Sequence, residues 1–253
     1  MIDLSNAKEE FLRYTNQFDV NDFNIKRKIS HSIRVMELCK NLATKLELDN
    51  EKIELLELIG LLHDIGRFEQ WNLYNSYSDF ETNTDHALMG IEVLEKDNYI
   101  RKYIKNDKYD NLIKKAIFNH NKYKIESNLT KDEIMFCNMI RDCDKTDIIY
   151  QATCIYWKDE TIINNGKISD KVYEEMIEEK IIENKFKENQ IDNLLGVLSF
   201  IFDMKYVEEI KVIKENNYIN KIFSRFNFEN EQTQKRMENV RKMLNEYVSK
   251  KLK

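Results

Sequence analysis

The chain has 253 residues, enough to bury a substantial core, and 34% of them are charged, as in a protein with a well-solvated surface. Its 40 basic and 45 acidic residues give a net charge of −5, which disfavours general nucleic-acid binding because that function favours a basic face. The chain has no proline, where average usage would supply roughly 13, and five glycines, so long helices are favoured over a turn-rich β architecture.

The N-terminal residues are polar, and no run of about 18 uncharged apolar residues occurs. We therefore expect neither a signal peptide nor a membrane-spanning helix. The cysteines show no CxxC spacing, which predicts buried thiols in a reducing compartment rather than a disulfide framework; they are Cys39, Cys137, Cys143 and Cys154. These features together predict a cytoplasmic protein with no membrane partner.

Apolar residues recur at helical spacing through most of the chain, so the sequence predicts an all-α fold. The first predicted helices cover 24–47, 51–64, 86–97 and 107–120, and another begins at a Thr130–Glu133 capping box and runs through Asp144. Gly66 is expected to end the second helix. Residues 67–84 break the pattern and carry five aromatic side chains, which predicts a long loop that either covers a site as a lid or is anchored on the bundle.

The clearest turn, Asn164-Asn165-Gly166, precedes predicted helices near 169–185, 188–204, 206–226 and 229–250. No internal repeat and no linker long enough to require two domains is present. We therefore predict a metal-binding helical core over residues 1–165, with the C-terminal helices at 166–253 packed on it rather than forming an independent domain. These last helices carry no chemical signature, and they could close a pocket or form a homodimer contact.

All four histidines fall in one ordered series with two aspartates, at intervals of about one helix plus one loop. The series is His31, His63, Asp64, His86, His120 and Asp144. The residues lie on apolar helical stripes, where a lone histidine is more often a hydrogen-bonded core residue and a lone buried aspartate usually caps a helix or pairs with a base. Six of them, using the entire histidine content, instead indicate a metal site, because imidazole and carboxylate suit divalent transition metals and six donors suffice for two ions that share a bridge.

The string Leu62-His63-Asp64-Ile65-Gly66-Arg67 resembles the signature of the HD superfamily of metal-dependent phosphohydrolases. His31 upstream and Arg141-Asp142-Cys143-Asp144-Lys145 downstream match that family's first and last ligand motifs, so the resemblance covers roughly residues 24–150. It implies an HD-domain helical bundle, here with a C-terminal helical extension. It also implies that His31, His63, Asp64 and Asp144 hold one ion and that Asp64 bridges to a second.

His86 and His120 resemble the two extra ligands of the binuclear branches of this family, which include cyclic-dinucleotide phosphodiesterases, some CRISPR-associated nucleases and di-iron oxygenases. No Gly-Tyr-Pro segment follows His120, so the sequence departs from the cyclic-dinucleotide branch. No helicase domain accompanies the site, which weakens the resemblance to the nucleases.

The sequence thus predicts a phosphomonoesterase or phosphodiesterase that hydrolyses a phosphate ester of a nucleotide or another small phosphorylated metabolite. A metal-activated hydroxide would be the nucleophile, because coordination lowers the pKa of water to near 7. Asp64 is the predicted bridge, and Arg67 and Lys145 are candidate catalytic residues because each directly follows a ligand motif and could grip a phosphate; a solvated surface charge is the alternative for both.

One or two divalent ions are expected, and manganese, iron, cobalt, nickel, zinc and magnesium all remain open. A di-iron oxygenase, a non-catalytic nucleotide-sensing module and a nuclease are the alternative functions.

Overall fold

The computed structural model describes residues 2–155 and 160–253, and within these ranges every regular element is helical, which confirms the all-α prediction. The chain divides into two compact units, Met1–Asp144 and Lys145–Lys253. The division at residue 165 that the sequence suggests stays a prediction. Among the described helices, none combines the length and the apolar character that crossing a membrane would require.

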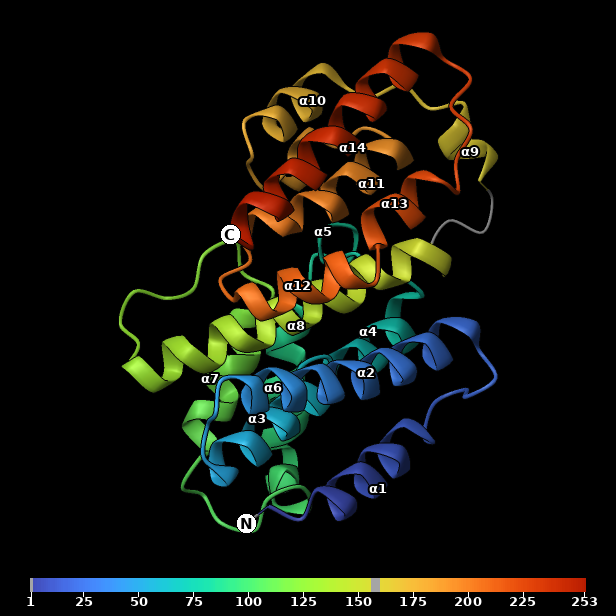
Figure 1. The fold of residues 1–253 in the computed structure, drawn as a ribbon. Coiled ribbons are helices and arrows are strands. Elements are labelled where there is room, and N and C mark those ends of the chain that lie inside the picture. Colours follow the sequence, from blue (N-terminus) through green and yellow to red (C-terminus); the bar gives the residue numbers. More distant parts are fainter. Residues whose placement is uncertain (1, 156–159) are drawn as a thin grey trace. The chain divides into compact units, whose positions relative to one another are not determined.

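The N-terminal unit is built from helices that largely match the predicted ones. They are α1 Leu4–Thr15, α2 Phe23–Lys45, α3 Asn50–Leu62, α4 Gly66–Tyr74, α5 Asp79–Thr82, α6 His86–Glu95, the 3₁₀ segment η1 Lys96–Lys102, α7 Asp110–His120 and the first part of α8 Lys131–Cys154 (Figure 1). The capping box is present, since Glu133 accepts a hydrogen bond from the Thr130 amide at 2.7 Å and the Glu133 amide donates to Thr130 Oγ1 at 3.3 Å.

Helix α3 forms the centre of this unit. All of its residues from Leu55 to Leu62 are buried, as expected of a helix that is apolar on every side. It packs against α1, α2 and α7, and α6 packs against α4 and α7. Helices α2 and α3 approach closely at Gly60, where a Cβ would lie 2.9 Å from Cys39 Sγ. His31 lies within α2, and His63 directly follows α3.

The prediction of a long loop at residues 67–84 is wrong. Gly66 begins α4 instead of ending the preceding helix, and α5 forms a further helical turn. Phe68 is the reason that α4 docks, because its ring is fully buried against Phe11, Tyr14 and Phe18, with centroids about 5.8–6.1 Å apart. Nine residues with a single deeply buried aromatic give too little periodicity to reveal such a helix.

The C-terminal unit is a second helical assembly with a continuous apolar core. Its elements are the remainder of α8, α9 Thr161–Asn164, α10 Asp170–Ile177, η2 Asn184–Phe186, α11 Gln190–Ser199, η3 Phe200–Asp203, α12 Val207–Glu215, α13 Tyr218–Phe223 and α14 Glu231–Lys251. Helix α14 packs against α10, α12 and α13. The single helix expected at 206–226 is two helices, separated at Asn217, whose φ of 55° lies in the left-handed region.

Candidate metal centre

The six donors of the sequence series converge within the N-terminal unit although they come from five parts of its helical framework. His31 lies within α2, His63 directly follows α3, and Asp64 occupies the turn before α4. His86 begins α6, His120 ends α7, and Asp144 lies on α8. The four histidines are each at most 4% exposed, so every one of these side chains faces the interior.

The Asp64 carboxylate stands between two groups of donors. Its Oδ2 lies 3.3 Å from His31 Nε2 and 3.6 Å from His63 Nε2, and Asp144 Oδ1 lies 3.1 and 3.5 Å from the same two nitrogens. Its Oδ1 lies 3.4 Å from both His86 Nε2 and His120 Nε2. Each oxygen of one carboxylate therefore faces a different pair of imidazoles.

Three of the four imidazole rings contact an oxygen through Nδ1, and this contact fixes which ring nitrogen carries the hydrogen. His63 Nδ1 is 2.8 Å from the Gly60 carbonyl oxygen, and His120 Nδ1 is 2.5 Å from that of Ile117. His86 Nδ1 is 2.6 Å from Asp79 Oδ2. Since an oxygen can only accept, Nδ1 must donate in each case, and a neutral ring then presents a lone pair at Nε2.

Two such lone pairs face each other across 3.0 Å between His86 Nε2 and His120 Nε2. Neutral nitrogens at this separation repel unless a cation lies among them. Two donors bound at a right angle, each about 2.1 Å from one ion, would be about 3.0 Å apart, so the spacing suits a transition metal with imidazole and carboxylate ligands. The residues present therefore fit divalent metal binding.

The ionisation of the side chains also suits metal ligands. Burial lowers the pKa of His63, and burial together with the Arg67 charge lowers the pKa of His86 to about 3, so both rings are neutral at pH 7. Burial by itself would raise the pKa of Asp64, but the Lys28 ammonium holds it well below its usual range. Both predicted acidic ligands are ionised, since the neighbouring His31 side chain likewise holds the pKa of Asp144 well below its usual range against the effect of burial.

The two predicted phosphate-gripping residues lie in different surroundings. The Arg67 guanidinium donates from Nη1 to Gln70 Oε1 at 2.7 Å, the Tyr77 carbonyl at 2.5 Å and Asp79 Oδ1 at 3.1 Å, while its Nε lies 3.6 Å from Asp64 Oδ1. The Lys145 ammonium forms an ion pair with Asp203 within the C-terminal unit. A catalytic role for either residue stays a prediction.

Two features hold neighbouring helices in register at the centre. Gly66 starts α4 against α6, where a Cβ would lie 2.3 Å from the His86 carbonyl oxygen and 2.4 Å from the Gly90 nitrogen. The buried Arg141 side chain on α8 donates to carbonyl oxygens at the end of α7, at 3.0 Å for Asn119 and 3.4 Å for His120. Because Asp144 lies three residues after Arg141, this contact couples the helices that carry Asp144 and His120.

Sequence reasoning missed two charged residues of the centre. Lys28 is buried and donates from Nζ to Asp64 Oδ2. It lies three residues before His31 on the same face of α2, a spacing that could have indicated it. Asp79 bonds to His86 from α5, within the segment expected to be a loop, and no periodic signal marks it.

Comparison with known families agrees with this geometry. A family model described as HD domain matches residues 29–182, more than half of the chain. The chain therefore belongs to the HD domain family, whose members are commonly metal-dependent phosphohydrolases. Neither the search of curated proteins nor that of solved structures found a match.

Proposed function

We propose that this chain is a metal-dependent phosphohydrolase that cleaves a phosphate ester of a nucleotide or another small phosphorylated metabolite. The observation that carries the proposal is the Asp64 carboxylate, whose two oxygens each face a separate pair of imidazole nitrogens at 3.3–3.6 Å. When bound at such a centre, divalent ions activate water as a nucleophile and neutralise charge that develops on a phosphoryl group.

The balance of charge favours an anionic substrate. The six donors carry two negative charges, on Asp64 and Asp144, so two divalent ions would leave the centre positively charged. Lys28 and Arg67 add two positive charges beside Asp64. Arg27 extends this basic group, since Arg27 Cζ, Lys28 Nζ and Arg67 Cζ lie 5.4, 5.5 and 5.9 Å from the centre of the Tyr77 ring.

Each side chain then has a distinct role in the proposed reaction. His31, His63, Asp64 and Asp144 would hold one ion, and Asp64 together with His86 and His120 would hold the other. Lys28 and Arg67 orient the phosphate by donating to its oxygens. The proposed reaction requires no serine or cysteine nucleophile.

The test is a hydrolysis screen of the protein after chelation and reloading with manganese, iron, cobalt, nickel, zinc or magnesium. Nucleotides, cyclic nucleotides and generic phosphate esters serve as substrates, and released phosphate and nucleotide products are measured with and without oxygen. We expect turnover that requires a divalent ion, persists without oxygen, and is lost in Asp64→Ala together with metal while helical content is kept. Turnover that consumes oxygen would indicate an oxygenase, and nucleotide binding without turnover would indicate a sensor.

A further inference from the structure

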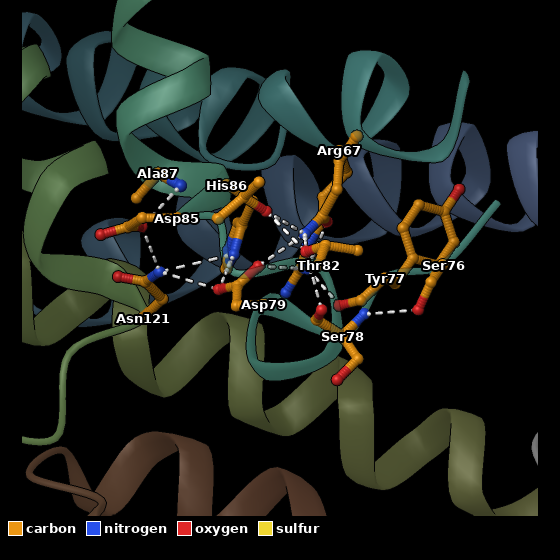
Figure 2. Close-up of polar contacts among 12 residues, drawn as sticks. Arg67, Ser76, Tyr77, Ser78, Asp79, Thr82, Asp85, His86, Ala87 and Asn121 are labelled. Atoms are coloured by element: carbon orange, nitrogen blue, oxygen red, sulfur yellow. Dashed lines mark hydrogen bonds and ion pairs between the residues drawn. The ribbon is translucent and has the colours of Figure 1, made fainter. Parts of the chain in front are cut away.

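Asp79 contacts the His86 ring on the side that faces away from the other donors. Its Oδ2 lies 2.6 Å from His86 Nδ1, and Figure 2 shows the carboxylate between the imidazole and the Arg67 side chain. Asp79 is the first residue of α5, and its side chain is 31% exposed. The contact therefore comes from a short segment outside the main helices of the unit.

His86 needs such a partner because of its place in its helix. His63 and His120 lie at the C-terminal ends of α3 and α7, and each uses the carbonyl three residues earlier in its own helix, from Gly60 and Ile117. His86 is the first residue of α6, so no preceding turn of that helix can supply a carbonyl. A side chain from elsewhere must accept the Nδ1 hydrogen, and Asp79 does so.

The Asp79 carboxylate is itself held in place. Its Oδ1 accepts hydrogen bonds from Gln70 Nε2 at 2.8 Å and Arg67 Nη1 at 3.1 Å. Ser78 caps α5 by accepting from the Glu81 amide at 3.2 Å. These contacts fix the carboxylate from α4 and from the turn that precedes α5, so it can set the orientation of the ring.

A third cation site is the competing interpretation, since donor atoms of Asp79, Asp85 and His86 lie within 4.8 Å of one another. The protein already satisfies these atoms, however. Asp85 accepts from the Ala87 amide at 3.0 Å and Asn121 Nδ2 at 2.8 Å and pairs with Lys122, while His86 Nδ1 donates to Asp79. These contacts favour a positioning role over another ion.

We propose that Asp79 is a positioning residue that holds the His86 ring as its Nδ1–H tautomer, so that Nε2 completes the donor group of Asp64, His86 and His120. This inference rests on the proposed metal-dependent function. Partners of metal-bound histidines orient the ring, and their loss typically weakens metal affinity 10- to 100-fold.

The first test reads the tautomer directly in the metal-free protein. The chain has four histidines, so ¹⁵N NMR can resolve each ring, with His86→Gln as the assignment control. We expect the Nδ1–H form of His86 in the wild type and a mixture of tautomers in Asp79→Ala, with the other three rings unchanged. An Nε2–H form of His86 in the wild type would overturn the inference.

The second test titrates the chelated protein with Mn²⁺ by calorimetry. Asp79→Ala should weaken one of two binding steps about 10- to 100-fold and leave the other, which also shows that the variant is folded. Asp79→Asn, which keeps an acceptor oxygen, should recover part of the loss, and Asp85→Asn, a neighbouring carboxylate that keeps its capping oxygen, should match the wild type.

Three outcomes separate the two proposals. Unchanged affinities in Asp79→Ala would overturn the positioning role while leaving the proposed function intact, as would a third wild-type ion that disappears in both Asp79→Ala and Asp85→Asn. Failure of the wild type to bind any ion would contradict the proposed function, and the tautomer measurement then still decides the role of Asp79.

Discussion

The two units each bury a carboxylate, but they satisfy it in different ways. In the C-terminal unit, fully buried Asp192 accepts from the Ser169 amide at 3.0 Å, Ser169 Oγ at 2.6 Å and the Glu188 amide at 3.0 Å. In the N-terminal unit, Asp64 is 3% exposed and faces the Nε2 atoms of imidazole rings. Three of these rings carry their hydrogen on Nδ1, where it is donated to an oxygen other than those of Asp64. Burial alone therefore does not mark a metal centre; the kind of partner atom does.

The largest effect on folding is expected from Asp192→Ala. It removes the acceptor of two amides and a hydroxyl that are partly buried, and each lost hydrogen bond costs about 0.5–1.5 kcal/mol, so the free energy of unfolding should fall by about 2–4 kcal/mol in urea titrations. Mn²⁺ affinity of the folded variant should not change. Asp170→Ala, which removes a mostly exposed carboxylate that pairs with Arg236, is the matched control and should cost less than about 1 kcal/mol. Loss of metal binding in Asp192→Ala would break the contrast between the two carboxylates.

Gly66→Ala should lower the free energy of unfolding by a smaller amount. Unlike Asp192→Ala, it should also affect metal binding. The added Cβ would overlap the α6 backbone at 2.3–2.4 Å, and relief of such overpacking costs about 1–3 kcal/mol. Because α6 begins with His86, Mn²⁺ affinity should fall as well, measured by calorimetry alongside thermal unfolding.

Gly90→Ala is the control on the facing helix. Its Cβ would meet nothing closer than 3.4 Å, and alanine is favoured over glycine in helices by about 1 kcal/mol, so this variant should be neutral or more stable. Equal effects of the two substitutions would show that the close approach at Gly66 does not matter.

A further effect concerns pH. Burial lowers the pKa of His63, and it lowers that of His86 from near 6.5 to about 3. At acidic pH the two rings are therefore protonated in the unfolded chain but not in the folded chain. The free energy of unfolding of the metal-free protein should fall as the pH drops below about 6.5, by up to about 1.4 kcal/mol per pH unit for each ring.

Urea titrations between pH 7 and pH 4 with a chelator present measure this dependence, and His86→Gln should reduce the slope. The C-terminal unit contains no histidine, so the change should arise in the N-terminal unit. A stability that stays level over this range would contradict neutral burial of the two rings.

The sequence reveals those parts of the centre that lie on long amphipathic helices. His31, His120 and Asp144 could be found because each occupies an apolar stripe that a 3.6-residue period exposes. Asp79 could not be found, because its role depends on how the chain returns from α4 to α6 and not on any local pattern. Helix α4 was missed for a related reason, since one buried ring at Phe68 fixes it through contacts with residues some 50–57 positions earlier.

The distribution of the donors along the chain has a consequence for biosynthesis. The set begins at His31 and is completed at Asp144, and Arg141 joins the last two helices that contribute to it. A nascent chain still shorter than this carries only an incomplete set. The group formed by His31, His63, Asp64 and Asp144 is therefore complete only after the ribosome has released α8, and an ion held by these four residues would be captured late in the synthesis of the N-terminal unit.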